Sequence, residues 1–277
     1  MKEKVLIGQV AAPFLHVMTF NIRRRMPKAL PPSADRWATR QPAVAELIRS
    51  ERPTLLGVQE ALPGQARFVA QTLGRGHRRI GHGRNADGQG EGTPLYFDTD
   101  RLRLLEWSQL ALSDTPDKPG SRGWGNLTPR ELVRAEFRDR ATGIRFLAIN
   151  THFDNFSRRA RVAAAAQVRQ LVADSGLPAI VTGDLNTGDG TTALVELLRD
   201  GVLVDAWGAA EKRLTPEWGT FTNYRDPQLK RKRIDWIAVT PGVTVDRIGI
   251  DPRRPGGVWA SDHLPVQAVV RLPEVGA

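Results

Sequence analysis

Residues 179–186, Ala-Ile-Val-Thr-Gly-Asp-Leu-Asn, pass from an apolar run directly into a carboxylate and an amide. The run 179–182 is short and rich in β-branched residues, which is typical of a strand that is covered on both faces. The alanine-rich segment 158–174 before it predicts a helix that ends at Ser175-Gly176. A helix followed by a buried strand predicts an α/β domain, and Asp184 and Asn186 mark the end of that strand as a candidate site.

Other apolar runs along the chain end in, or border on, polar side chains of the same kinds. Any one of these short patterns is a common turn or strand end, and short motifs often occur by chance. Their recurrence at strand ends favours one convergent site instead of unrelated turns. The residues concerned are Asn21, Glu60, His152, Asp154, Asp184, Asn186, Asp235, Asp262 and His263.

The sequence predicts a single domain over residues 1–277, because it contains neither an internal repeat nor a linker. The N-terminal residues 1–17 are interpreted as part of the mature fold and not as a signal peptide. Predicted strands cover 17–22, 55–60, 94–97, 131–137, 144–150, 233–239 and 266–271; predicted helices cover 36–52 and 191–199; predicted loops cover 23–32, 74–92 and 113–129.

Composition excludes several classes of protein. The chain has 277 residues, 40% hydrophobic and 25% charged, which is ordinary for a globular protein. Cysteine is absent, so disulfides, thiolate catalysis and cysteine-ligated zinc are excluded. No apolar run approaches the roughly 18 residues that a membrane-spanning helix needs. We therefore expect a soluble monomer in the cytoplasm, with secretion as the alternative.

The chain is strongly basic, with a formal net charge of +10 and a pI of about 10.7. Only seven of its 40 basic residues are lysine, so arginine dominates. This excess is either a compositional habit of the source genome or a surface that attracts phosphates and other polyanions. Net charge alone does not decide between the two, because it indicates a partner only where it is clustered.

Taken in order, the motifs resemble the endonuclease/exonuclease/phosphatase superfamily from Val17 to Val266. The resemblance implies a four-layer α/β sandwich of two packed mixed β-sheets flanked by helices. It also implies divalent-metal-dependent hydrolysis of phosphoric esters. The motifs are Thr19-Phe20-Asn21-Ile22, Gln59-Glu60, Asn150-Thr151-His152-Phe153-Asp154, Gly183-Asp184-Leu185-Asn186, Ile234-Asp235-Trp236-Ile237 and Ser261-Asp262-His263.

The resemblance also assigns a metal site. Glu60 is the best single ligand candidate, with Asn21 and Asp262 completing or orienting the shell. Oxygen ligands suit a hard cation, and Mg²⁺ takes only one or two carboxylates while it keeps several waters. We therefore expect Mg²⁺ or Mn²⁺ as the cofactor.

The implied catalytic group contains five side chains. His263 pairs with Asp235, whose carboxylate fixes the imidazole tautomer and stabilises its charged form. Asp184 and Asn186 hold the attacking water and a phosphoryl oxygen. The general base is either Asp184 or the His263–Asp235 pair. His152 donates to a non-bridging oxygen or protonates the leaving group.

Differences from the motifs of known branches of the superfamily reduce the number of substrate classes to consider. Inositol-polyphosphate phosphatases typically have an arginine shortly after the Gly-Asp-x-Asn motif and a Ser-Asp-His-Arg ending, whereas Thr187 follows Asn186 and Leu264 follows His263 here. Repair endonucleases of the exonuclease III type have Pro-Asn where this chain has Asn150-Thr151-His152. The chain is instead similar to an uncharacterised bacterial branch of the superfamily.

Basic residues follow or precede four of these motifs, and we expect them to line the rim of the site and hold an extended polyanion. The clusters are 23–25, 158–161, 230–233 and 253–254. Arg84 and Arg130 are expected closer in, and Trp124 is either a stacking surface or a packed loop anchor. The predicted substrate-binding residues are Arg84, Arg130, Asp154, Trp124, Lys230, Arg231 and Lys232.

Three functions remain open at the level of sequence. The first is a metal-dependent phosphodiesterase or nuclease, whose partner is a phosphate-containing substrate such as a nucleic acid. The second is a phosphomonoesterase, or a sphingomyelinase-like phosphodiesterase of lipid headgroups, although no amphipathic aromatic insertion for membrane docking is evident. The third is a catalytically inactive nucleic-acid-binding module, which the complete set of catalytic residues disfavours.

Overall fold

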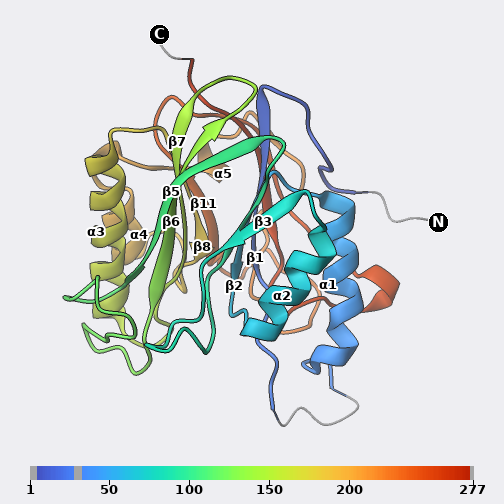
Figure 1. The fold of residues 1–277 in the computed structure, drawn as a ribbon. Coiled ribbons are helices and arrows are strands. Elements are labelled where there is room, and N and C mark those ends of the chain that lie inside the picture. The colour runs from blue at the N-terminus through green and yellow to red at the C-terminus, as the bar shows by residue number, and fades with distance from the viewer. Residues whose placement is uncertain (1–4, 28–32, 275–277) are drawn as a thin grey trace.

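The structure, a computed structural model, describes residues 5–27 and 33–274. Two mixed β-sheets pack face to face, and helices cover their outer faces, which gives four layers (Figure 1). The architecture predicted from the sequence is therefore confirmed. Part of the predicted loop 23–32, namely residues 28–32, and the first four residues of the predicted N-terminal segment lie outside the described residues.

The first sheet has seven strands in the order β10-β12-β13-β1-β2-β4-β3. It is mixed because β1 runs parallel to β2 and antiparallel to β13. Two helices, α1 (Trp37–Glu51) and α2 (Pro63–Leu73), pack against its outer face. The strands are β1 (Phe14–Asn21), β2 (Leu55–Gln59), β3 (His77–Ile80), β4 (Leu95–Asp98), β10 (Lys212–Arg213), β12 (Thr244–Ile250) and β13 (Val266–Arg271).

The second sheet has six strands in the order β5-β6-β7-β8-β11-β9, of which only β7 and β8 pair in parallel. The helices α3 (Arg158–Ser175) and α4 (Thr192–Leu197) cover it. Its strands are β5 (Leu102–Ala111), β6 (Glu131–Asp139), β7 (Arg145–His152), β8 (Ala179–Asp184), β9 (Val204–Asp205) and β11 (Asp235–Val239). The short elements are α5 (Ala206–Ala209) and 3₁₀ turns at Arg199–Gly201 and Pro255–Gly257.

Three apolar cores separate the four layers. Alternation along β1 is the clearest example: Leu15 and Val17 enter the core between the sheets, whereas Met18 and Phe20 face α1 and α2. Three phenylalanine rings pack together in the core between the sheets, with Phe137 4.8 Å from Phe97 and 5.7 Å from Phe146 between ring centroids. Burial on both faces explains why the central strands read as continuous apolar runs.

Polar side chains join the two sheets near the carboxyl ends of β2 and β7. Asn150 on β7 donates from Nδ2 to the carbonyl oxygens of Val58 and Pro94 at 2.8 and 3.2 Å. Its Oδ1 accepts from Gln59 Nε2 on β2 at 2.7 Å and from Thr182 Oγ1 at 3.1 Å. Because every one of these groups is buried, the hydrogen bonds fix how close the two sheets lie at this end.

Some elements differ from the sequence prediction. The strand β3 lies inside the predicted loop 74–92, because two arginines hide its short apolar pattern. Three longer elements, α2, β5 and β12, were not predicted at all, and neither were the short elements β9, β10 and α5. The signals for α2 were present, since Pro63 occupies its first turn and Gly74 follows its last residue. Strand β5 lies at a sheet edge, only its first and last residues are buried, and polar residues interrupt its apolar ones.

Candidate active site

Strand register brings the predicted catalytic residues to one end of the sandwich. His152 at the end of β7 pairs with Asp184 at the end of β8, and Asp184 in turn pairs with Asp235 at the start of β11. In the facing sheet, Asn21 ends β1 beside Gln59, the last residue of β2. The parallel strands therefore end together, and the antiparallel strand β11 begins where β8 ends.

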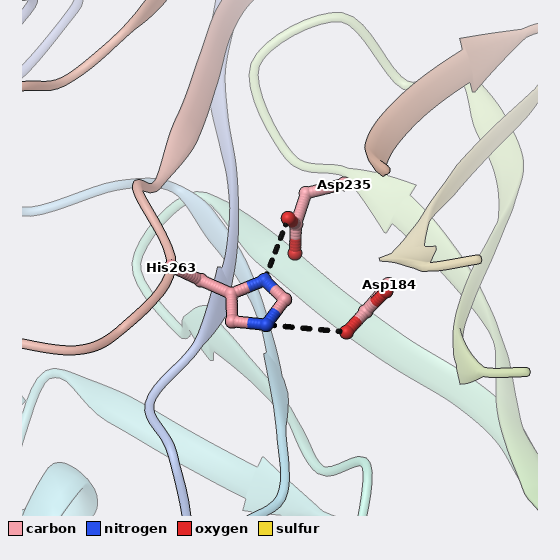
Figure 2. Close-up of side chains that lie close together, drawn as sticks. All are labelled: Asp184, Asp235 and His263. Carbon is pink, nitrogen blue, oxygen red and sulfur yellow. Dashed lines mark hydrogen bonds and ion pairs between the residues drawn. The ribbon is translucent and has the colours of Figure 1, made fainter. Parts of the chain in front are cut away.

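His263 lies between two carboxylates (Figure 2). Its Nδ1 is 2.8 Å from Asp235 Oδ2, and its Nε2 is 3.8 Å from Asp184 Oδ2. All three residues are buried. Burial disfavours a charged imidazole, but the negative charges of Asp235 and Asp184 outweigh it and raise the pKa of His263 well above its ordinary value. Burial and the neighbouring Asp235 raise the pKa of Asp184 to about 7.

His152 lies on the other side of Asp184, with Nε2 3.6 Å from Asp184 Oδ2. Asn186 Nδ2 is 3.0 Å from His152 Nε2 and also donates to the carbonyl oxygen of Phe153 at 3.0 Å. Burial lowers the pKa of His152 far below its ordinary value, and the charges of Arg130 and other nearby cations act in the same direction. The ring is therefore neutral, with one nitrogen that donates and one that accepts.

Glu60 faces this group from the other sheet. Its carboxylate accepts from Asn21 Nδ2 at 3.0 Å and from the backbone N–H of Arg24 at 3.1 Å. Burial alone would raise the pKa of Glu60, but these hydrogen bonds prevail and lower it, so the side chain is ionised. Glu60 has a φ of 60°, a left-handed conformation that is unfavourable for a side chain of this size. Such backbone strain is often found at functional sites.

Asp262 completes a set of oxygen donors with Glu60 and Asn21. The guanidinium of Arg23 lies 3.6 Å from Asp262 Oδ2 and 3.9 Å from Glu60 Oε2, so both carboxylates face the same cation. Ser261 Oγ donates to the carbonyl oxygen of Asn21 at 2.7 Å and ties the segment to β1. A donor set of two carboxylates and an amide fits a hard divalent cation such as Mg²⁺ or Mn²⁺.

A second group could also hold a metal by distance alone, since ligand atoms of Asp184, Asp235 and His263 all lie within 4.8 Å of one another. The hydrogen bond from His263 Nδ1 to Asp235 and the raised pKa of the imidazole argue for a different role. A protonated imidazole has no free electron pair for a metal. We therefore interpret this group as an acid–base pair with a neighbouring carboxylate.

The cleft above these groups has a volume of about 500 Å³. Asn21 and Asp235 lie behind its wall, fully buried, where they orient Glu60 and His263. The other predicted catalytic and metal-binding residues line it: Glu60, His152, Asp184, Asn186, Asp262 and His263.

Arg84 and Arg130 form the cationic part of the cleft. Arg130 is only 6% exposed, and its Nη2 donates to Asn155 Oδ1 at 2.8 Å while its Nε lies 3.4 Å from Asp154 Oδ2. Its buried Nη1 has no hydrogen-bond partner within the described part of the chain. Arg84 pairs with Glu91 at 3.1 Å, and burial lowers its pKa, with the charge of Arg130 acting in the same direction. Each guanidinium thus has one carboxylate neighbour, and among the described residues Nη1 of Arg130 stays unpaired.

Asp154 and Trp124 are structural supports. Asp154 Oδ1 accepts the backbone N–H groups of Phe156 and Ser157 at 2.9 and 2.6 Å, and its other oxygen faces Arg130. Trp124 donates to Asp114 Oδ1 at 2.7 Å and packs against the core beneath α3. Within the described residues, neither side chain lines the cleft.

Of the four basic clusters, only the first contributes to the cleft wall, through Arg23 and Arg24. Residues 230–232 are exposed but do not line the cleft, judged on the described residues. The expectation for Arg253 was wrong, because its side chain pairs with Asp251 at 2.6 Å and with Glu51 near the outer face of the seven-stranded sheet. Basic residues that lie next to the site motifs in sequence therefore do not all lie next to the cleft in space.

Sequence reasoning missed several residues that line the cleft, among them Asn155, Phe221 and Asn223. Asn155 orients Arg130, and its position directly after the Asn-Thr-His-Phe-Asp motif was an available signal. Phe221 packs on His263 with 5.1 Å between ring centroids, and Asn223 follows two residues later. No motif in the sequence marked these last two residues.

Comparison with known proteins points to one family. A family model described as the endonuclease/exonuclease/phosphatase family matches residues 18–263. A search of curated proteins by sequence gives no match. Among solved structures, a mannosyl-6-phosphatase from Bacteroides thetaiotaomicron has a TM-score of 0.86 and 30% identity, covering 92% of this chain and 99% of its own.

Two further solved structures extend the comparison. A Bacteroides vulgatus protein described as an endonuclease/exonuclease/phosphatase has a TM-score of 0.85 and 32% identity, covering 94% of this chain and 99% of its own. The catalytic domain of human Nocturnin, with a bound sulfate, has a TM-score of 0.69 and 18% identity, covering 93% of each chain. At that identity the likeness shows the shared fold alone.

Proposed function

Because the chain belongs to the endonuclease/exonuclease/phosphatase family, we propose that this hydrolase of phosphoric esters is a divalent-metal-dependent phosphomonoesterase of sugar phosphates. The observation that carries the proposal is Arg130, which lines the cleft beside the catalytic cluster and whose buried Nη1 has no hydrogen-bond partner among the described residues. A phosphomonoester dianion carries more charge than a diester, and Arg23, Arg24 and Arg84 line the same cleft. A volume of about 500 Å³ is in the range of small-molecule sites.

The solved structure of a mannosyl-6-phosphatase supports the choice of a sugar phosphate, since it is 30% identical over nearly its whole length. The described residues contain no helix long and apolar enough to cross a membrane. We further infer that one catalytic domain carries the site, because both sheets contribute residues to it.

The chain's own residues divide the chemistry between two sides of the cleft. Glu60 and Asp262 would hold the divalent cation, with the buried Asn21 orienting Glu60, and the bound cation would neutralise charge on the phosphoryl group and favour attack by water. On the opposite side, Asp184 orients the attacking water and accepts its proton, while the protonated His263, held by Asp235, stabilises negative charge on the phosphoryl group.

The rest of the cleft acts on the phosphoryl group and the leaving oxygen. Arg84 and Arg130 bind non-bridging oxygens and hold the ester in line for attack. His152 faces the leaving oxygen, to which a ring N–H can donate. Asn186 fixes the orientation of that ring through the contact between Nδ2 and Nε2.

A phosphodiesterase or nuclease is the second candidate, because residues 230–232 form an exposed basic segment shortly before Asp235. Such a segment fits an extended polyanion better than a small monoester. In this case the substrate would extend out of the cleft toward that loop.

The test is a substrate panel with Mg²⁺, Mn²⁺ or EDTA. It contains hexose 6-phosphates, bis-p-nitrophenyl phosphate, and single- and double-stranded oligonucleotides, with His263→Ala as the catalytic control. We expect hexose phosphates to be hydrolysed best, EDTA to abolish the activity, and His263→Ala to lower kcat at least about 10³-fold. A preference for oligonucleotides would favour the second candidate. Activity that persists in EDTA or in the variant would contradict the mechanism.

A further inference from the structure

A second cavity, of about 140 Å³, lies beside the catalytic cleft. Arg84 and Arg130 line both, so the two guanidiniums stand between them. The other walls come from β5 and from the loops 82–85 and 119–120. We call this space the side cavity; none of the roles assigned above uses it.

The side cavity offers neutral hydrogen-bonding groups around an aromatic ring. Trp107 on β5 is 42% exposed, and its indole N–H makes no hydrogen bond to a described residue. The amide of Asn85 is likewise without a partner among the described residues. His82 contacts the carbonyl oxygen of Gly83 through Nδ1 at 3.1 Å, which leaves Nε2 free. Donors and acceptors beside an open ring face match the hydroxyl groups and the C–H face of a sugar.

The walls of the side cavity are held in place by Gln109 and Glu131. Gln109 Oε1 accepts the backbone N–H of His82 at 3.0 Å, and its Nε2 donates to Glu131 Oε2. Glu131 Oε1 accepts the backbone N–H of Thr93 at 3.1 Å. Burial raises the pKa of Glu131 to about 8, so this wall is neutral near pH 7 and does not repel a phosphorylated ligand.

The position of the side cavity fits that of a leaving group. His263 and Asp184 line the catalytic cleft together with His152 and Arg130. A small space of about 10 Å³ is lined by Glu60, His152, Arg130 and Glu131 but not by His263, and the side cavity is lined by Arg130 and Glu131 but not by His152. The order therefore runs from the His263–Asp235 pair, past His152, to the side cavity. In-line displacement places the attacking and leaving oxygens on opposite sides of phosphorus.

We propose that the side cavity binds the sugar ring of the substrate, with Trp107 packed against one face of the ring. The proposal rests on the proposed function, since it assigns the part of a sugar phosphate that leaves with the oxygen. Arg84 and Arg130 then hold the phosphoryl group while Asn85 and His82 contact hydroxyl groups. Trp107 is a specificity-determining residue in this assignment.

The test compares Trp107→Ala, Trp107→Phe and the control Leu105→Ala on the same strand. Leu105 is similarly exposed but does not line the side cavity. The substrates are mannose 6-phosphate, glucose 6-phosphate, 5′-AMP, and glycerol phosphate, which lacks a ring. Removing a contact made equally in ground and transition states raises KM and leaves kcat unchanged. We expect Trp107→Ala to raise KM about tenfold for the hexose phosphates only. Trp107→Phe should bring KM most of the way back to the wild-type value, and Leu105→Ala should leave KM unchanged.

If Trp107→Ala raised KM equally for hexose phosphate and glycerol phosphate, the assignment would be overturned. An increase in KM confined to AMP would overturn it as well. Calorimetric titration of hexose phosphate in EDTA separates this proposal from the proposed function, because it needs no turnover. If no monoester is hydrolysed, the proposed function fails. The side cavity is then judged by whether Trp107→Ala weakens hexose phosphate binding about tenfold, and equal binding by wild type and variant would refute it.

Discussion

The imidazole of His263 has a carboxylate next to each of its nitrogens, and the two carboxylates have different roles. Asp235 Oδ2 is in direct hydrogen-bond contact with Nδ1, whereas Asp184 is further away and lines the cleft. Asp235 therefore orients the ring from behind and cannot reach the substrate. An amide in its place would keep the shape but remove the negative charge and permit the wrong tautomer.

For Asp235→Asn we expect kcat to fall by about 10²- to 10⁴-fold with little change in KM, because ring orientation and charge are lost while the binding residues remain. Steady-state kinetics on the best substrate measures this effect. The charge-matched control is Asp226→Asn, at an exposed carboxylate. Wild-type kcat in Asp235→Asn, with an intact circular dichroism spectrum, would contradict the role given to this residue.

At the residue scale, the motifs were sufficient to predict which polar side chains lie together at the strand ends, because strand ends are fixed by apolar runs that are visible in the sequence. The motifs did not suffice to predict which basic side chains line the cleft. Arg24 and Arg253 both belong to basic clusters next to motifs, yet one lines the cleft and the other pairs with Glu51. Long side chains leave the backbone in directions that no sequence spacing determines.

At the scale of elements, Gly57 on β2 sets the contact between the two sheets. A Cβ atom at this position would clash with Asn150 Oδ1 and Thr182 Oγ1 of the facing sheet. Both groups are buried and hydrogen-bonded to each other, so neither can turn away without leaving a partner unpaired. The close approach of β2 to β7 and β8 therefore requires glycine here.

We expect Gly57→Ala to lower the free energy of unfolding by about 2–3 kcal/mol, because overpacking and a disturbed buried hydrogen bond act together. Urea denaturation followed by fluorescence measures the change. Gly64→Ala in α2 is the matched control, since an added Cβ there meets nothing within 4 Å, and it should be neutral or slightly stabilising. Equal stabilities of the two variants would refute the argument.

The elements that the sequence predicted are those buried on both faces, such as β1, β2 and β8. Strand β5 escaped prediction because its apolar residues neither alternate regularly nor form a continuous run, since Arg103, Glu106, Ser108 and Gln109 interrupt them. This has a functional consequence, because the end of β5 supplies Trp107 to the side cavity. The least predictable element thus forms the part of the surface on which we base substrate specificity.

At the scale of the whole molecule, a buried network covers the outer face of the seven-stranded sheet. His16 Nε2 is 2.9 Å from Gln267 Oε1, and Gln267 Nε2 donates to Asp251 Oδ2 at 3.0 Å. Glu51, at the end of α1, and Arg253 continue the network. Burial lowers the pKa of His16 to about 4, although the charge of Glu51 acts against it. His16 is therefore neutral in the folded protein.

This depressed pKa makes stability depend on pH. In the unfolded chain His16 takes up a proton near pH 6.5, whereas the folded chain does not until about pH 4. The contribution of neutral His16 to the free energy of unfolding is therefore complete above pH 6.5. As pH falls toward 4, this free energy decreases by up to about 3 kcal/mol. Urea denaturation should show that the free energy of unfolding decreases less between pH 7 and pH 4.5 for His16→Gln than for wild type. An equal loss in both proteins would contradict this assignment.

The pairing of β1 with β13 also determines where the described C-terminal end lies. Arg271, at the end of β13, pairs with Phe14 at the start of β1, whereas Asn21, behind the wall of the cleft, is at the other end of β1. Eight residues of strand place the two ends roughly 23 Å apart. An affinity tag or carrier fused beyond β13 would leave the molecule from the end opposite the cleft. The protein can therefore be immobilised through this end with its cleft facing the solution.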